Sequence, residues 1–181
     1  MDTPRRGVRP TASLVREALF NILGEAVVGA AVVDLYAGAG TVGFEALSRG
    51  AASLLAVDRD PSVLALIRGT AERLGCSDRV RTEVGEVSRW LRGRPAEVPR
   101  ADLVYIDAPY GDQALPTVLA ELGAAPPALV VCEHHRAQSL PPAAGGLRCD
   151  REAVYGSTKL SFYARDVGAE RRAPPSRRES P

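Results

Sequence analysis

The sequence predicts an α/β fold: a doubly wound, mostly parallel seven-stranded sheet that ends in an antiparallel hairpin and follows an N-terminal helix. Three observations support this prediction. Apolar runs rich in β-branched residues alternate with segments whose apolar residues recur at helical spacing. The connecting segments are short, as they are where helices link parallel strands. Near the end of the chain, residues 148–155 and 158–165 form two strand-like segments joined through Gly156 and Ser157, which is typical of a hairpin.

Length and composition indicate one domain. The chain has 181 residues, and its 45% hydrophobic content is sufficient for a core and argues against disorder. We place the domain at residues 1–166, with an N-terminal arm and helix at residues 1–24. Residues 167–181 are rich in Pro, Arg and Ser and have too few apolar side chains to pack, so we expect a disordered tail there.

No segment reaches the roughly 18 consecutive apolar residues of a membrane span, and the amino terminus is too polar for a secretory signal. The three cysteines, Cys76, Cys132 and Cys149, are too widely spaced for a disulfide framework or for paired metal ligands. We therefore expect a cytoplasmic protein with reduced thiols and no contact with membranes.

The net charge of +1 produces no overall field that would require a nucleic-acid partner. Arginine is nevertheless concentrated near the start of the chain, at Arg5, Arg6, Arg9 and Arg16. A guanidinium group can bind phosphate through two hydrogen bonds, whereas terminal arginines also serve solubility. Both RNA contact and a solubilising role stay open for this cluster.

Residues 12–23 predict an amphipathic helix that precedes the first strand. Thr11 or Ser13 can cap its start, and Gly24 can end it. We expect its apolar stripe to pack on the domain, and this stripe consists of Leu14, Ala18, Leu19, Ile22 and Leu23.

The first predicted strand, residues 31–36, leads into a turn with Gly38, Gly40 and Gly43 that opens the next helix. Glycines let the backbone approach a ligand closely, and the helix start offers free N–H groups, so a nucleotide-like ligand could bind there. The same spacing matches the dinucleotide fingerprint. A tight turn without any ligand is the remaining interpretation.

Two acids follow the next two strands, which a helix over residues 61–74 joins. Asp58 ends the second strand, residues 53–57, where a carboxylate can accept hydrogen bonds from both ribose hydroxyls of an adenosine. Glu86 follows the third strand, residues 79–84, which is less apolar and so expected near a sheet edge. Glu86 could reach an adenine amino group or interact favourably with the dipole of the helix that it precedes.

The fourth predicted strand, residues 102–106, ends at the sequence Asp107-Ala108-Pro109-Tyr110. This corner offers a carboxylate, a backbone carbonyl and the flat ring of Tyr110, while Pro109 removes a backbone donor. A planar substrate that carries an amine needs these groups. Asp and Pro are also ordinary turn residues, so a strand-to-loop turn with no ligand is the alternative.

A fifth strand, residues 128–132, follows a helix over residues 114–122 and ends at Glu133. The next two residues are His134 and His135. Adjacent residues of an extended segment point in opposite directions, and no third ligand stands at a familiar spacing, so we expect no metal site.

The glycine turn and the Asp107 corner belong together in this topology. In a doubly wound sheet the ligand crevice lies at the carboxyl ends of the strands, where the strand order reverses beside the first strand. We therefore expect the first and fourth strands to be neighbours, with Asp58 on the other side of the glycine turn. A domain that only binds NAD leaves the corner without a task, whereas a methyltransferase uses all three features.

On these residues the sequence resembles the class I S-adenosylmethionine-dependent methyltransferases, and within them the bacterial RsmD-type family, which methylates guanine N2 in 16S ribosomal RNA. The resemblance spans residues 9–164 and rests on residues 9–11 with 15–23, 34–51, 107–110 and 155–156. It implies a Rossmann-like fold, S-adenosyl-L-methionine as cofactor, and small-subunit ribosomal RNA or an assembling ribosomal particle as partner. We expect a monomer that uses no metal.

The resemblance also implies which residues contact the cofactor. Asp34, Gly38 and Gly40 would line its methionine end, Asp58 would hold its ribose, and Glu86 would lie near its adenine. The full predicted cofactor set is Asp34, Tyr36, Gly38, Gly40, Asp58, Glu86 and Asp107.

The implied catalytic residues are the four of the corner. The Asp107 carboxylate and the Ala108 carbonyl would accept hydrogen bonds from the target amine, beside Pro109, while Tyr110 stacks on the flipped base. The residues predicted to contact RNA are Arg9, Thr11 and Arg16.

Family members usually carry proline where this sequence has Ala108. The carbonyl acceptor survives this change. Two other functions stay open: a methyltransferase for another planar amine, such as a protein glutamine or a DNA base, and a non-catalytic RNA-binding or assembly protein that retains the cofactor pocket.

Overall fold

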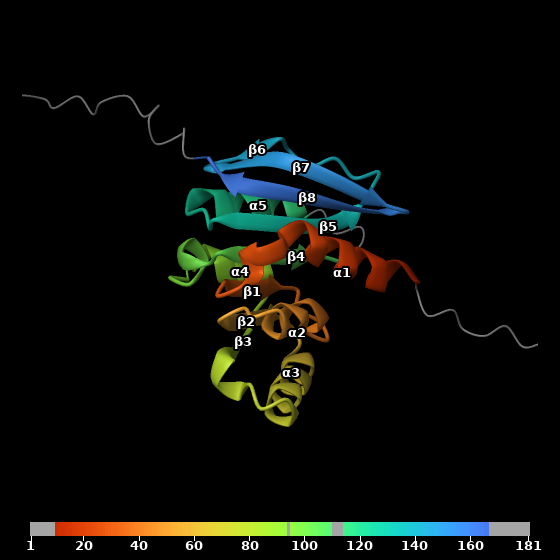
Figure 1. Ribbon diagram of the computed structural model, residues 1–181. Helices are drawn as coiled ribbons and strands as arrows, with labels where there is room; N and C mark the ends of the chain where they lie inside the picture. Colours follow the sequence, from red (N-terminus) through yellow and green to blue (C-terminus); the bar gives the residue numbers. More distant parts are fainter. Residues whose placement is uncertain (1–9, 94, 110–113, 167–181) are drawn as a thin grey trace, which may run out of the picture.

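The structure, a computed structural model, describes residues 10–93, 95–109 and 114–166, with side chains from residue 13 onward. Within these ranges one sheet has eight strands in the order β3-β2-β1-β4-β5-β8-β7-β6 (Figure 1). The strands are β1 (Ala31–Leu35), β2 (Ser53–Asp58), β3 (Val80–Val84), β4 (Leu103–Asp107), β5 (Leu129–His135), β6 (Ala143–Ala144), β7 (Leu147–Tyr155) and β8 (Thr158–Arg165). The α-helices are α1 (Pro10–Leu23), α2 (Thr41–Ser48), α3 (Pro61–Arg73), α4 (Val87–Arg92) and α5 (Leu115–Ala124). Three short 3₁₀ helices are η1 (Gly24–Val27), η2 (Ser77–Arg79) and η3 (Val98–Arg100).

The predicted doubly wound sheet with a C-terminal antiparallel hairpin is confirmed. Strands β1 to β5 pair in parallel, while β8 pairs antiparallel with both β5 and β7. Strand β1 lies between β2 and β4, so the strand order reverses beside it, as predicted. The less apolar strand β3 lies at an edge of the sheet, which was also predicted.

The predicted number of seven strands is wrong, because Ala143–Ala144 forms the additional short strand β6. It pairs with the start of β7 across a turn at Gly145, whose φ is 57°. Gly123 of α5 permits this turn, since a Cβ there would lie 1.9 Å from the carbonyl oxygen of Ala144. This pairing depends on a contact with a distant helix, and two alanines carry no strand periodicity of their own.

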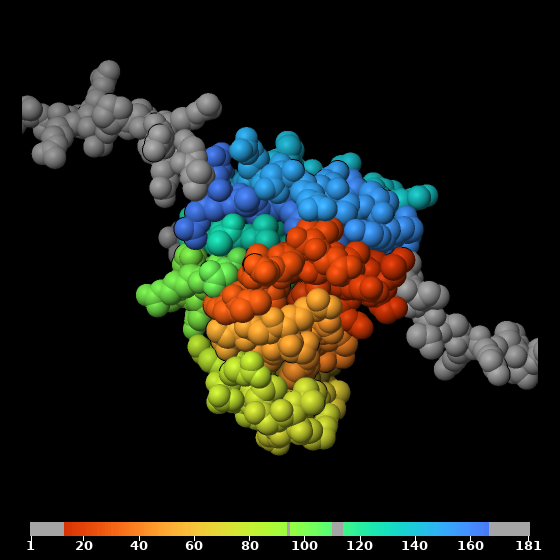
Figure 2. All heavy atoms as spheres, viewed as in Figure 1, coloured from red at the N-terminus to blue at the C-terminus, as the bar shows by residue number. Residues whose placement is uncertain are grey.

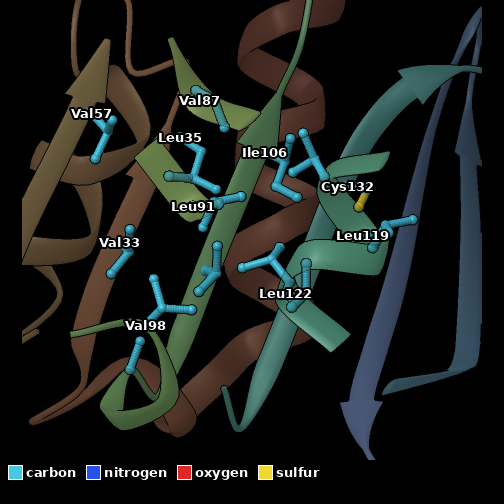
Figure 3. Close-up of a cluster of buried hydrophobic side chains, with 14 of the residues drawn as sticks. Val33, Leu35, Val57, Val87, Leu91, Val98, Ile106, Leu119, Leu122 and Cys132 are labelled. Atoms are coloured by element: carbon cyan, nitrogen blue, oxygen red, sulfur yellow. The ribbon is translucent and has the colours of Figure 1, made fainter. Parts of the chain in front are cut away.

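Helices cover both faces of the sheet, because alternate residues of each strand point to opposite sides. Helices α4 and α5 pack on one face, where Leu91, Leu119 and Leu122 meet strand residues such as Leu35 and Ile106 (Figure 3). Helices α1 and α2 pack on the other face. In Figure 2 the surface of α1 forms a red band between the blue hairpin and the orange segment that holds α2.

Helix α1 begins at Pro10, two residues before the predicted start, because proline suits the first turn of a helix. Its buried side chains are Val15, Leu19, Phe20 and Leu23. Leu14, which we expected in the apolar stripe, is 54% exposed. The buried face of α1 is therefore turned around the helix axis, by about the angle between two successive residues, from the face that the sequence predicts.

In the described ranges, no helix has the length and apolar character that are needed to cross a bilayer. The thiols of Cys76, Cys132 and Cys149 are all free, and the first two are buried. The predicted disordered tail lies outside the described residues, and the domain limits stay predictions.

Candidate active site

A cavity of about 880 Å³ opens at the carboxyl ends of strands β1 to β5. Its volume lies in the range of about 300–1,000 Å³ that is usual for ligand pockets. Its walls come from segments that are far apart in the sequence, and they include Tyr36, Gly38, Asp58, Arg59, Asp60, Gly85, Glu86, Val87, Asp107, Ala108, Pro109, Glu133, Ser157 and Thr158. The cavity thus joins the glycine turn, Asp58 and the Asp107 corner.

The chain leaves β1 through a turn whose dihedral angles are rare for L-residues. Tyr36 has a φ of 62°, and Gly38 and Gly40 have φ values of 51° and 72°. Glycine adopts such angles freely, whereas a bulky residue such as Tyr36 is strained by about 1–3 kcal/mol. The turn places Tyr36 and Gly38 on the cavity wall.

Gly40 and Gly43 allow close contact between the glycine turn and the helices. A Cβ at Gly40 would lie 3.1 Å from Ile67 Cγ1, and one at Gly43 would lie 2.5 Å from Leu54 Cδ2. These contacts let α3 and β2 approach the turn and α2. Gly40 is buried and does not line the cavity, so its contact with the cofactor stays a prediction.

Both carboxylate oxygens of Asp58 accept hydrogen bonds from backbone N–H groups. Its Oδ2 accepts a hydrogen bond from the N–H of Gly38 at 3.0 Å, and its Oδ1 accepts one from the N–H of Asp60 at 3.0 Å. The carboxylate is thereby fixed on the cavity wall, and each oxygen keeps a further lone pair for a ligand hydroxyl. A carboxylate fixed in this way could also accept hydrogen bonds from ribose hydroxyls, and that contact stays a prediction.

Glu86 caps helix α4. Its carboxylate accepts hydrogen bonds from the N–H groups of Ser88 at 3.0 Å and Arg89 at 2.8 Å. The Arg89 and Ser88 hydrogen bonds lower the pKa of Glu86 below its ordinary value. Of the two interpretations from sequence, the favourable contact with the helix start is therefore present. Glu86 also lines the cavity, and its contact with adenine stays a prediction.

Asp34 lies behind the cavity wall and is 2% exposed. Burial raises its pKa well above the ordinary value, and the charges of Asp107 and Asp58 add to this effect, while the N–H of Gly43 opposes it. A buried carboxyl group of this kind would be stabilised in its charged form by a nearby cation.

Asp107 ends β4, and its Cα is the register partner of Glu133 on β5. Ala108 is 6% exposed, and it lines the cavity together with Pro109. The Asp107 carboxylate accepts no hydrogen bond from another residue within the described ranges. Tyr110, which the sequence predicts to stack on a base, lies outside those ranges.

Asp107 lines the open cleft, and part of its surface is accessible to solvent. The cleft walls still remove much of the water around it, and this burial, followed by the charge of Glu133, raises the pKa of Asp107 to about 7. Burial also raises the pKa of Glu133, although the hydrogen bond from Tyr105 opposes this shift. Both groups would gain from a cationic ligand or from hydrogen-bond donors.

The sequence prediction missed four residues of this region: Tyr105, Glu133, Ser157 and Thr158. The Tyr105 hydroxyl donates a hydrogen bond of 2.5 Å to Glu133 Oε2, and the other three residues line the cavity. The signal for Glu133 was present, because it directly follows the predicted strand 128–132 as Asp107 follows the predicted strand 102–106. Ser157 and Thr158 reach the cavity only through the antiparallel pairing of β8 with β5.

Of the three residues predicted to contact RNA, only Arg16 has a described side chain. Arg9 lies outside the described residues, and Thr11 is in the first turn of α1, where no side chain is described. Arg16 is half-buried on α1. Arg16 is not among the described residues that line the cavity. The contact of all three residues with RNA stays a prediction.

His134 and His135 differ in environment, as expected for neighbours in a strand. His134 is 2% exposed, and its Nε2 lies 2.8 Å from Ser161 Oγ, whereas His135 is exposed. Among the residues that the structure describes, no group of three or more His, Cys, Asp or Glu side chains could hold a metal ion.

Known proteins are similar to this chain in sequence and in fold. Ribosomal RNA small subunit methyltransferase D of Escherichia coli strain K12 is 32% identical over 174 residues, which cover 93% of this chain and 84% of that protein. The protein of the same name from Haemophilus influenzae is 30% identical over 138 residues, covering 74% of this chain and 72% of that protein. A solved structure of a conserved hypothetical protein from Streptococcus pyogenes matches with a TM-score of 0.73 and 28% identity, covering 83% of this chain and 94% of that chain.

A sequence model of the family described as Conserved hypothetical protein 95 matches residues 2–164. This match includes both the glycine turn and the Asp107 corner. The chain therefore belongs to this family, which is the RsmD-type methyltransferase family that the sequence resemblance predicted.

Proposed function

We propose that this protein transfers a methyl group from S-adenosyl-L-methionine to the exocyclic N2 of a guanine in small-subunit ribosomal RNA. Membership of the family supports the reaction class, and the printed names of the relatives from E. coli and H. influenzae support the substrate class. The observation that carries the proposal is the position of the Asp107 corner on the same cavity as Gly38 and Asp58. One cleft can therefore hold a nucleotide-like cofactor and an amine-bearing base.

The residues of the cleft fit this cofactor, which has one net positive charge near neutral pH. Asp34, Asp58 and Asp107 offer carboxyl groups on or behind the wall. Among the described lining residues, Arg59 is the only basic one. Asp34 and Gly38 would line the methionine end, Asp58 would hold the ribose, and Glu86 would lie near the adenine. When bound, S-adenosylmethionine supplies an electrophilic methyl group on its sulfonium centre.

At the substrate end, the proposed role of the protein is to position the base. The exocyclic nitrogen of guanine is weakly nucleophilic, because its lone pair is delocalised into the ring. The Asp107 carboxylate and the Ala108 carbonyl would accept hydrogen bonding from the amine, return electron density to the nitrogen and orient it. Tyr110 would stack on the flipped base and offset part of the few kcal/mol that flipping requires.

We also propose that Arg9, Thr11 and Arg16 contact the RNA and that the enzyme acts as a monomer without a metal. Arg16 lies on α1, which packs on the same face of the sheet as Tyr105. An RNA strand that enters the cleft from this face would pass near α1. Arg16→Gln would then weaken RNA binding and reduce its dependence on salt.

The proposal is tested by radiolabelled methyl transfer to small-subunit RNA and to ribosomal particles from a strain that lacks the gene for this protein. The nucleoside that carries the label is then identified by mass spectrometry. We expect N2-methylguanosine at one position. Transfer to protein or DNA but not to RNA would contradict the proposed substrate, and binding of RNA and cofactor without transfer would favour a non-catalytic assembly role.

A further inference from the structure

Glu133 lies in the cleft, but it belongs to none of the sequence motifs and the proposed reaction assigns it no role. It lines the cavity, near the end of β5. Its register partner on β4 is Asp107. Directly paired residues of neighbouring parallel strands project to the same face of the sheet, so the two carboxylates stand side by side in the cleft.

The Glu133 carboxylate is held in one orientation by Tyr105. The hydroxyl of Tyr105 donates to Glu133 Oε2 at 2.5 Å, and Tyr105 is itself 3% exposed, so its ring is fixed in the core of the α1 face. In the described part of the chain, the other oxygen, Oε1, accepts no hydrogen bond, and no lysine, arginine or histidine forms an ion pair with Glu133. A fixed carboxylate in the cleft thus keeps free acceptor positions for a ligand.

Guanine offers the complementary pattern of hydrogen-bond donors. On its Watson–Crick edge the N1–H and one N2–H point in the same direction and are spaced to meet the two oxygens of a carboxylate. The second N2–H points away from this pair. Adenine has an acceptor at N1 and no amino group at C2, so it cannot form the same pair of bonds.

We propose that Glu133, oriented by Tyr105, recognises the Watson–Crick edge of the target guanine by accepting hydrogen bonds from its N1–H and one N2–H. Asp107 and the Ala108 carbonyl then receive the second N2–H. Glu133 is the residue that selects guanine, and Tyr105 is a positioning residue that acts through it. This inference rests on the proposed function, because it assigns the base that this same cleft accepts.

The test is a change of base preference. A synthetic RNA carries at the mapped methylation site either guanine or 2,6-diaminopurine, which keeps the 2-amino group but has an acceptor at N1. Wild-type protein should prefer guanine by about 10- to 100-fold in kcat/KM, the discrimination that a bidentate base contact provides. In Glu133→Gln the side-chain amide can donate to N1 of diaminopurine and accept from its N2–H. This variant should lose activity on guanine and move the preference toward diaminopurine by at least about tenfold.

Tyr105→Phe is the matched control, because it removes only the hydroxyl that orients Glu133. It should raise KM for the guanine RNA by a few-fold while the preference for guanine over diaminopurine keeps its direction. Calorimetry should show the same cofactor affinity in wild type, Glu133→Gln and Tyr105→Phe. This readout separates recognition of the base from damage to the cofactor site.

An unchanged ratio of the two activities in Glu133→Gln, with transfer to guanine intact in the wild type, would overturn the inference and leave the proposed function standing. An equal loss of activity on both bases would also overturn it, because that result indicates a structural role only. Absence of methyl transfer to any RNA guanine by the wild type would overturn the proposed function and this inference with it.

Discussion

The two ends of the cleft hold their carboxylates in opposite ways. At the proposed cofactor end, Asp58 and Glu86 each accept two hydrogen bonds from backbone N–H groups at 2.8–3.0 Å. At the proposed substrate end, Asp107 and Glu133 have raised pKa values, and within the described ranges neither carboxylate accepts a hydrogen bond from a backbone N–H. The fold itself satisfies the first pair and leaves acceptor positions of the second pair for a ligand.

This difference is consistent with the proposed roles of the two ends. A carboxylate that is already hydrogen-bonded is a fixed acceptor, which suits recognition of the hydroxyls and amines of a cofactor. A desolvated carboxylate without backbone donors gains more from ligand N–H groups or from a cation, so it suits the place where a reacting amine would bind. Substitutions at the two ends should therefore separate cofactor binding from methyl transfer.

The largest effect is expected for Asp107→Ala. This change removes the acceptor that orients the target amine, and it should lower kcat by at least about a hundredfold, comparable to the loss of one preorganised hydrogen-bonding group in an active site. Affinity for S-adenosylmethionine, measured by calorimetry, should stay nearly unchanged. Asp150→Asn, at an exposed acid on β7, is the control and should keep full activity. Substantial turnover by Asp107→Ala would defeat the assigned role.

A smaller effect, on binding rather than turnover, is expected for Asp58→Ala. The change removes the predicted ribose acceptor and releases the Gly38 N–H that Asp58 fixes. Cofactor affinity should fall by about 10- to 100-fold, the equivalent of one or two hydrogen bonds to a charged group. Calorimetry measures this loss, and unchanged affinity would count against the ribose assignment.

Gly43→Ala tests the scaffold of the cofactor end. The new methyl group would overlap Leu54, which is 1% exposed and cannot rotate into solvent. The free energy of unfolding in urea should fall by about 1–3 kcal/mol. Gly69→Ala in α3 is the matched control: its Cβ would meet only Arg73 Nη1 at 3.6 Å, so stability should rise by about 0.5–1 kcal/mol. Equal effects of the two substitutions would show that the contact with Leu54 has no influence.

The smallest effect is expected in the pH dependence of stability without cofactor. The raised pKa of Asp107, about 7 against an ordinary 3.8, means that the folded state holds a proton that the unfolded state releases. The stability that this group contributes is fully present below pH 3.8 and is lost as the pH rises through about 7. Melting temperatures at pH 5.5 and 8 should therefore differ more in wild type than in Asp107→Asn. An identical difference in both proteins would argue against the raised pKa.

Most of the fold could be predicted from the sequence, because it follows from local patterns. Apolar runs such as residues 103–106 and the glycine turn each carry their own signal, and parallel topology then places the turn beside Asp107. The short strand β6 could not be predicted, since it forms through the contact between Gly123 and the turn at Gly145. The buried row of α1 was shifted because periodicity alone does not determine which of two adjacent rows faces the sheet.

The site residues that stand in recognisable sequence motifs were predicted. The site residues that reach the cleft only through the pairing of strands were missed. Asp58 and Asp107 each end a strand and stand in recognisable motifs. Glu133 and Tyr105 belong to no motif, and their relation appears only when the pairing of β4 with β5 aligns Glu133 with Asp107. Glu86 was left open between two roles, because a helix cap and a ligand contact require the same acid at the same position.

The most direct test of the divided cleft is the single-turnover rate of methyl transfer at saturating S-adenosylmethionine, measured for Asp58→Ala and Asp107→Ala on the same RNA. Excess cofactor compensates for weak binding, so Asp58→Ala should return to within about tenfold of the wild-type rate, whereas Asp107→Ala should stay at least about a hundredfold lower. If both variants lost the same fraction of the single-turnover rate, and saturating cofactor restored neither rate, the division between a cofactor end and a substrate end would be contradicted.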